Sequence, residues 1–206
     1  VVPDTRFRNF NQDWKAYKLS DLGELFTGLS GLSKNDFSNG EHKYVTYMNV
    51  FSNTIININD LSAVDLTKKP KQNGLRKGDL LFTTSSETPQ EVGMASYFGH
   101  NIDHVYLNSF CFGFRTNISK ADGLFLAYFM RSNVVRNRLN KLAQGSTRYN
   151  LSKTEFIKMT INIPCLNEQI KIGEFFRQLD EVIDLKEQEL EALKQTKKGF
   201  LQKMFV

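Results

Sequence analysis

Two histidines and a cysteine are the residues of this chain that come closest to the spacing of a metal site. His100 and His104 are four residues apart, and Cys111 follows them. A structural zinc ion needs four ligands and a helix or tight knuckle that directs the imidazole rings toward one point. The segment around the histidines has the composition of a loop followed by a strand, and it offers no fourth ligand. We therefore predict surface or partly buried histidines and no metal site.

Sequence motifs for catalysis are missing as well. An Asn-Pro-Pro-aromatic or Asp-Pro-Pro-aromatic methyltransferase motif needs adjacent prolines, and no two of the four prolines are adjacent. No Gly-Lys-Ser/Thr sequence is present to form a phosphate-binding loop. Pro3-Asp4 and Glu41-x-Lys43 match a metal-dependent nuclease motif only in fragments so short that they arise by chance. We predict that the chain has no catalytic residues and uses no cofactor.

Three segments carry side chains that suit contact with nucleic acid. Lys and Arg bind phosphates, and Arg, Asn, Gln, Ser and Thr read base edges. Thr83–Thr88 follows a predicted strand, Gly145–Asn150 is a polar loop, and Glu41–Lys43 leads into a strand that opens at Tyr44. From these segments we predict the following DNA-binding residues: Lys43, Tyr44, Thr84, Ser85, Ser86, Ser146, Thr147, Arg148, Tyr149 and Asn150.

Each segment also has a structural interpretation. Turn formation or helix capping explains the first two as well as DNA contact does. For the third, a solvated lead-in to a strand is the better explanation. Arg148 is the strongest single candidate for a base contact, whereas Asn150 can brace its own loop through bonds from side chain to backbone. The net charge of +5 favours an anionic partner without identifying it.

The residues before Pro164 predict a mixed domain with a β-rich core. Ser20 is a candidate N-cap for a first helix. We expect strands at Tyr44–Val50 and Thr54–Ile58, joined by a hairpin connection. Apolar residues spaced by 3.6 positions predict helical structure from Asp122 to Leu142. Four shorter strands and a capping box complete this part: Leu80–Thr84, Val105–Leu107, Phe110–Arg115, Ile161–Ile163 and Ser152–Glu155.

A different pattern runs from Asn167, a candidate N-cap, to Phe205. Ten positions from 172 to 204 alternate steps of four and three residues, which is the spacing of a coiled-coil seam. Lys186 and Lys197 occupy two of them. A straight helix of this length spans about 58 Å, so we expect a partner helix rather than a helix folded back on its own domain. The eight apolar seam residues are the predicted dimerisation residues: Ile172, Phe176, Leu179, Ile183, Leu190, Leu193, Phe200 and Met204.

Composition and cysteine usage favour a soluble cytoplasmic protein. The longest apolar run, Leu124–Met130, is far shorter than the ~20 residues that span a bilayer. The N-terminus lacks the basic and apolar layout of a signal peptide, and because it begins with Val1 we expect a trimmed chain. Cys111 and Cys165 do not form a secreted disulfide framework, and we expect both in the core.

Several of these segments together resemble the specificity subunits of type I restriction–modification systems. The entry to a target-recognition domain is matched around Arg6-Phe7, Trp14 and Lys18-Leu19. The long helix is similar to the conserved region of these subunits, and it carries the most specific match. The matching pieces are Pro164-x-Leu166-x-Glu168-Gln169-x-x-Ile172-x-x-Phe175-Phe176-x-x-Leu179-Asp180-x-x-Ile183, Lys197–Phe205, Lys77–Thr83 and Gly145–Ser152.

The resemblance implies an α+β fold with two parts and a role in DNA recognition. Residues 1–165 would be a target-recognition domain that reads one half of a bipartite site in double-stranded DNA. Residues 166–206 would be a long coiled-coil helix that sets the spacing, and methyltransferase subunits, and through them the restriction subunit, would dock on the assembly. We expect no catalysis by this chain and no membrane contact.

One departure from the family pattern concerns length. Members usually carry two recognition domains and two long helices, and this chain has one of each. The chain is therefore either half of a longer subunit or a half-length subunit that pairs as an antiparallel homodimer. The rival interpretation is a coiled-coil adaptor with a recognition-like domain that no longer reads DNA. Salt-dependent, sequence-selective DNA binding separates the two.

Overall fold

Strand β5 (Leu80–Thr83) is an inner strand of the largest described sheet, and all four of its residues are buried. The computed structural model describes residues 3–205, apart from the side chains of Ser38 and Asn39. β5 lies between β9 and β7 in an antiparallel sheet of order β2-β9-β5-β7. Phe82 of β5 stacks on Phe112 with ring centroids 5.2 Å apart, and Phe156 packs edge-on against both rings. The strands of this sheet are β2 (Gly23–Thr27), β5 (Leu80–Thr83), β7 (Ala95–Tyr97) and β9 (Cys111–Thr116).

Three smaller sheets surround this centre. β3 pairs antiparallel with β4 and parallel with β8. β1 pairs with β12, which ties the beginning of the domain to the segment before the long helix. The third sheet has the order β10-β11-β6. Their strands are β1 (Lys15–Lys18), β3 (Phe37–Val45), β4 (Leu61–Val64), β6 (Ser85–Ser86), β8 (Val105–Leu107), β10 (Ala143–Gln144), β11 (Tyr149–Leu151) and β12 (Thr160–Ile163).

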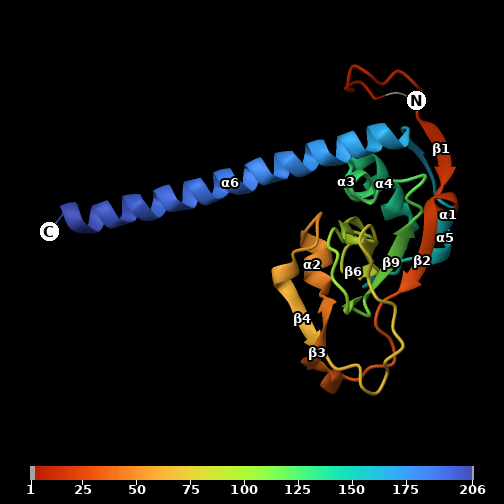
Figure 1. Cartoon of the computed structure of the whole chain (residues 1–206), viewed down its shortest axis with the longest axis horizontal. Coiled ribbons are helices and arrows are strands. Elements are labelled where there is room, and N and C mark those ends of the chain that lie inside the picture. The colour runs from red at the N-terminus through yellow and green to blue at the C-terminus, as the bar shows by residue number, and fades with distance from the viewer. Residues whose placement is uncertain (1–2, 206) are drawn as a thin grey trace.

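The helices cover the sheets, and one of them extends far from the rest of the molecule. α3 packs against β5, β7 and the first turns of α6, while the remainder of α6 projects away from the domain (Figure 1). The helices are α1 (Leu19–Leu22), α2 (Tyr47–Ser52), α3 (Gly123–Arg131), α4 (Asn133–Leu142), α5 (Lys153–Lys158) and α6 (Leu166–Met204), with single 3-10 turns at Lys34–Asp36, Ile58–Asp60 and Pro89–Glu91.

The fold class and many local predictions are confirmed. The chain is α+β with one long C-terminal helix. Strands form at the four shorter predicted positions, within a residue at either end. The Ser152 hydroxyl accepts a hydrogen bond from the backbone N–H of Glu155, as expected for the N-cap of α5. These elements were predictable because caps and side-chain alternation act over a few residues.

The expected first helix and first hairpin are wrong. The N-cap of α1 is Lys18 rather than Ser20, and the helix has a single turn because β2 begins at Gly23. The expected strand from Tyr44 ends at Val45, and α2 replaces its second half and the predicted hairpin. The Thr46 side chain caps α2 by accepting a bond from the N–H of Asn49.

Tertiary contacts of one buried side chain explain the helix. The Asn49 amide donates to the backbone oxygens of Asn57 and Asp60 at 2.8 and 2.9 Å and accepts from the N–H of Asn57. These bonds fold the expected strand at Thr54–Ile58 into a loop whose backbone meets the sheet at an isolated bridge from Ile55 to Tyr97, while Ile56 is buried in the core.

Two further boundaries and one cysteine differ from the prediction. The helical stretch from Asp122 to Leu142 is broken at Ser132, whose backbone is extended. The N-cap of α6 is Cys165 instead of Asn167. Cys111 is buried as expected, but Cys165 is exposed because it lies at this helix end on the surface.

The beginning of α6 is fixed to the domain by polar bonds and by a close approach of two helices. The Arg6 guanidinium forms a two-pronged ion pair with the buried carboxylate of Glu168, with both distances 2.6 Å. A Cβ on Gly173 would lie 2.9 Å from the backbone nitrogen of Phe125, so glycine lets α6 approach the start of α3. Two turns further along α6, Asp180 accepts a hydrogen bond of 2.7 Å from Tyr128 of α3. The direction in which α6 leaves the domain is therefore set by specific contacts.

Candidate nucleic-acid interface

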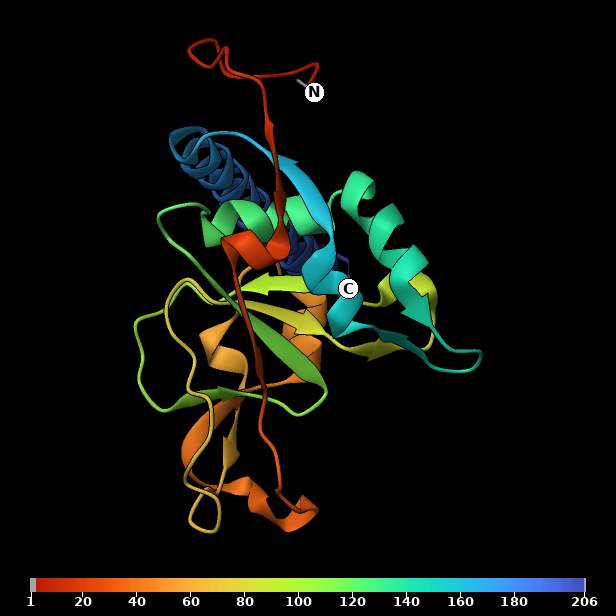
Figure 2. The same ribbon diagram turned by 90° about the vertical axis from the view of Figure 1, so that its right-hand side faces the viewer.

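The two segments with the strongest predicted DNA contacts lie side by side. β6 pairs antiparallel with β11, so that Ser85 lies opposite Asn150 and Ser86 opposite Tyr149. Both segments were expected as loops, and the structure places Ser85, Ser86, Tyr149 and Asn150 in strands. The loop proper is the tip of the β10–β11 hairpin, which projects from the side of the domain (Figure 2).

The hairpin tip carries the remaining predicted residues of this segment. Ser146, Thr147 and Arg148 are all exposed. Gly145 has a φ of 138°, and a Cβ there would lie 2.1 Å from the carbonyl oxygen of Arg148, so a glycine is needed to close the loop. The Asn150 amide donates a long hydrogen bond of 3.5 Å to the same carbonyl. This bond matches the predicted bracing role of Asn150.

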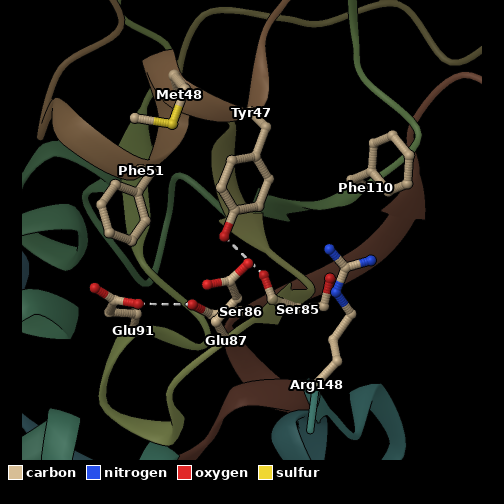
Figure 3. Close-up of a pocket in the computed structure, with 9 residues that line it drawn as sticks. All are labelled: Tyr47, Met48, Phe51, Ser85, Ser86, Glu87, Glu91, Phe110 and Arg148. Carbon is tan, nitrogen blue, oxygen red and sulfur yellow. Dashed lines mark hydrogen bonds between the residues drawn. The ribbon is translucent and has the colours of Figure 1, made fainter.

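An open pocket of about 380 Å³ lies where β6, the hairpin tip and α2 meet (Figure 3). Its polar lining comes from Ser85, Ser86 and Arg148, together with two carboxylates that follow β6. Its apolar wall consists of Tyr47, Met48, Phe51 and Phe110. In the close-up, the Arg148 side chain extends from the hairpin toward the Ser85 and Phe110 side of the pocket. Within the described residues, no ion pair engages its guanidinium.

Internal hydrogen bonds hold the floor of this pocket. Glu91 accepts from the hydroxyls of Ser86 and Thr88, both at 2.9 Å. The buried Arg136 guanidinium in turn donates to the backbone oxygens of Gln90, Val92 and Gly93. Burial lowers the pKa of Arg136, and the three carbonyls compensate the buried charge. The turn that contains Glu91 thus holds the short strand β6 in place.

A second, half-buried arginine supports the apolar side of the pocket. Arg131 donates to the carbonyl oxygens of Val50, Phe51 and Asn53 at 2.8 to 3.0 Å, which satisfies the C-terminal end of α2. It also donates to Ala95 in β7. Burial, and to a lesser extent the charge of Arg136, lowers the pKa of Arg131 to about 10. Arg131 therefore fixes α2 to the central sheet.

Tyr47, the first residue of α2, connects this helix to β6. Its phenol donates a hydrogen bond of 2.7 Å to the carbonyl oxygen of Ser85, and burial raises its pKa. Its ring stacks on Phe51 with centroids 6.0 Å apart. The phenol is therefore neutral and committed to this bond, so Tyr47 positions the strand.

Lys43 and Tyr44 are not part of this pocket. They lie in β3, the middle strand of the β4-β3-β8 sheet, and Tyr44 packs on Phe37 with ring centroids 5.3 Å apart. Tyr44 is half-buried and Lys43 exposed. The remaining predicted residue, Thr84, is half-buried, and its backbone bonds to Phe110 and Leu151. The structure therefore joins two of the three predicted segments and separates the third.

Several pocket residues were missing from the prediction. Met48 and Phe110 are 58% and 63% exposed, which is unusual for large apolar side chains beside a polar loop. Glu87 and Glu91 also line the pocket. The spacing of Tyr47 and Phe51 by four residues after a threonine N-cap was a sequence signal for α2. Its β-branched and aromatic neighbours favoured a strand instead.

The predicted dimerisation residues divide into two groups. Ile172 is half-buried against the domain core, and Phe176 stacks on Tyr128 with centroids 5.3 Å apart. From Leu179 onward, the seam side chains are 44% to 71% exposed. The helix thus packs on its own domain for its first turns only, and the other six seam residues form an uncovered stripe: Leu179, Ile183, Leu190, Leu193, Phe200 and Met204.

Metal-ligand and membrane features can be stated for residues 3–205. No three His, Cys, Asp or Glu side chains in this range are grouped to hold a metal ion. The Nε2 atom of His100 lies 3.1 Å from the carbonyl oxygen of Ile56. The ring of His104 lies beside that of His42, with centroids 5.5 Å apart. No helix in the described range is both long and apolar enough to cross a membrane.

Related proteins were compared with the chain by sequence and by structure. A Methanocaldococcus jannaschii protein described as a type I restriction enzyme MjaX specificity subunit is 22% identical over 204 residues, which cover 98% of this chain and 47% of that protein. The crystal structure of the type I restriction–modification S subunit from M. genitalium superposes with a TM-score of 0.59 at 17% identity, over 97% of this chain and 47% of that one.

A second solved structure has the same fold. The HsdS subunit from Thermoanaerobacter tengcongensis superposes with a TM-score of 0.56 at 16% identity, over 85% of this chain and 39% of that one. The chain thus spans about half the length of the relatives it matches. The family model of the type I restriction modification DNA specificity domain matches residues 11–195. With a match over most of its length and this fold, the chain belongs to the type I restriction modification DNA specificity domain family.

Proposed function

We propose that this chain reads one half of a bipartite DNA site as a specificity subunit. The observation that carries the proposal is the pairing of β6 with β11, which brings Ser85, Ser86 and Arg148 to one open pocket and sets Asn150 opposite Ser85. Such side chains bond to base edges in the major groove. The exposed hairpin tip gives Arg148 the reach that a base contact requires.

We further propose that the chain has a reading part, residues 1–165, and a spacing part, residues 166–206. The uncovered stripe on α6 supports pairing with a second long helix. Burial of one such apolar side chain stabilises an interface by about 1.5–3 kcal/mol before entropy is subtracted. A parallel pair would set Lys186 against Lys186 inside the seam. An antiparallel pair separates these charges and sends the two reading parts to opposite ends.

We propose the partners by analogy with the family. A specificity subunit works beside methyltransferase subunits and, through them, a restriction subunit, and we propose the same for this chain. One matched structure, with a TM-score of 0.59 at 16% identity, comes from work on complex assembly of the type I restriction–modification system. In this proposal the chain binds DNA and positions its partner subunits, and those partners catalyse methylation and cleavage. Methylation by the pure chain with S-adenosylmethionine, or cleavage with ATP and magnesium, would refute that division of labour.

Selection from a randomised duplex library tests DNA reading directly. The purified chain should enrich one sequence motif, and its affinity should fall steeply with salt because phosphate contacts release counterions. A coiled-coil adaptor without DNA reading would enrich nothing.

Arg148→Ala then tests the pocket. It should weaken binding of the enriched duplex by about 5- to 150-fold, since a good base contact contributes about 1–3 kcal/mol of discrimination. Binding of random duplex should change much less. An equal loss on both duplexes would mean that Arg148 touches only phosphate, and no loss on either would remove the hairpin from the interface.

A further inference from the structure

The pocket that contains Arg148 holds a second charged side chain from the neighbouring strand. Glu87 directly follows β6, and Arg148 directly precedes β11. The ladder ends at the pair Ser86 and Tyr149, so Glu87 and Arg148 are the next residues beyond that end, one on each strand segment. Both side chains line the same pocket.

Opposite charges at such positions usually form an ion pair, but these two do not. Among the salt bridges of the described residues, none includes Glu87 or Arg148. The other carboxylate of the pocket and its phenol are already engaged, because Glu91 binds the Ser86 hydroxyl and the Tyr47 phenol binds the carbonyl of Ser85. The pocket therefore presents one carboxylate and one guanidinium that are both available to a ligand.

This combination matches one base pair better than the others. In the major groove, guanine shows two adjacent acceptors, O6 and N7, and cytosine shows an amino donor at N4. A guanidinium binds both guanine acceptors at once, and a carboxylate accepts from the cytosine amino group. An A·T pair offers no two adjacent acceptors on one base, so the bidentate arginine contact is lost.

We propose that Arg148 and Glu87 form a binding site for the major-groove edge of one C·G base pair. Arg148 donates to guanine O6 and N7, and Glu87 accepts from cytosine N4. The exposed side chains of Met48 and Phe110 form the apolar rim beside this base pair. The inference rests on the proposed function, because it names the base pair that the DNA-reading pocket recognises.

Library selection with variants provides the first test. The motif enriched by the unaltered chain should contain a C·G pair whose preference is lost in both Arg148→Ala and Glu87→Ala. Lys141→Ala is the matched control, since this exposed lysine at the end of α4 lies outside the pocket. It removes one positive charge and should leave the motif unchanged. Thermal unfolding of each variant should match the parent, because both substituted side chains are exposed.

Base analogues at the enriched C·G pair provide the second test. N4-methylcytosine removes the free amino hydrogen, and 7-deazaguanine removes the N7 acceptor. Each analogue should reduce affinity of the unaltered chain by about 5- to 150-fold. N4-methylcytosine should reduce the DNA affinity of Glu87→Ala very little. Likewise, 7-deazaguanine should reduce the DNA affinity of Arg148→Ala very little.

The outcomes distinguish this inference from the proposed function. If the unaltered chain enriches no motif, DNA reading itself is refuted. If it enriches a motif that both variants retain at every position, only the C·G assignment is overturned. The assignment also fails if each analogue weakens the parent and the variants to the same extent.

Discussion

Arginine side chains serve two different purposes in this protein, and burial separates them. Arg131 and Arg136 are enclosed and bond to seven backbone carbonyls between them, so they support the walls of the pocket. Arg148 is exposed at a hairpin tip, with no ion pair in the described range. A charged donor that the fold does not use is available for a ligand. At the scale of the residue, the assignment of function therefore depends on which bonds are already made.

The two cysteines give a residue-scale test of the structure. Burial raises the pKa of the Cys111 thiol to about 12, whereas Cys165 is exposed at the start of α6. Because the thiolate is the reactive form, iodoacetamide at pH 8 should alkylate Cys165 quickly and leave Cys111 intact. Peptide mass mapping before and after unfolding in urea measures this difference. Equal labelling of both cysteines in the folded protein would contradict the burial of Cys111.

At the scale of the element, α2 is a short helix whose C-terminal carbonyls are bound by a distant side chain, Arg131. Arg131→Ala should lower the free energy of unfolding by about 3 kcal/mol, because it leaves several carbonyls without their charged donor. Arg131→Lys should recover only part of the loss, since an ammonium group cannot reproduce the planar fork. Urea unfolding provides the measurement.

Arg138→Ala is the control for this experiment. Arg138 is exposed and makes a single bond of 2.8 Å to the carbonyl of Thr160. Removal of the Arg138 side chain should lower the free energy of unfolding by less than about 1 kcal/mol. If Arg131→Ala were no more destabilising than this control, the support of α2 by Arg131 would be wrong.

The seam of α6 provides a second element-scale prediction. Leu193→Asp should convert a dimer into a monomer, because it inserts two uncompensated carboxylates into the seam. Leu185 is 64% exposed but lies on the opposite face from the seam, so Leu185→Asp should leave the dimer intact. Sedimentation velocity at micromolar concentration measures the oligomeric state of both variants. A monomeric unaltered chain would exclude pairing through α6.

A single substitution also reports the direction of pairing. When two copies of α6 are aligned antiparallel about residue 188, Lys186 of one lies opposite Leu190 of the other. Leu190→Glu would then gain a lysine partner and be tolerated. In a parallel pair, the two introduced carboxylates would face each other and the dimer would dissociate. The same sedimentation measurement distinguishes the two arrangements.

At the scale of the whole molecule, the length of α6 should determine the spacing of the DNA site. A twofold dimer of identical readers prefers an inverted repeat with an unread spacer. Deletion of residues 184–190 removes one heptad and keeps the seam in phase. It shortens the rod by about 10 Å, which corresponds to about three base pairs of DNA.

Library selection with the deletion variant measures this change. The half-site motif should stay the same, and the preferred spacer should become shorter. Enrichment of a non-palindromic site by the unaltered chain would refute the symmetric arrangement. An unchanged spacer in the deletion variant would show that α6 does not set the distance between the readers.

The amino-acid sequence by itself determined the features that depend on neighbouring residues. The heptad spacing predicted α6 and its uncovered seam, and the Ser152 cap predicted the start of α5. The turn Lys77-Gly78-Asp79 and the apolar residues after it placed β5 near its true bounds. Such signals extend over one or two turns, so they can be read without knowledge of the fold.

Only the tertiary structure decided which segments meet. Sequence offered Ser85 and Arg148 as separate loop residues, and the pairing of β6 with β11 brought them into one pocket. It also replaced a predicted strand with α2, because Asn49 and Arg131 bond to distant carbonyls that local propensity cannot register. The physical reason is the same in both cases. Hydrogen bonds between residues far apart in the chain outweigh local preference, and the site is built from such bonds.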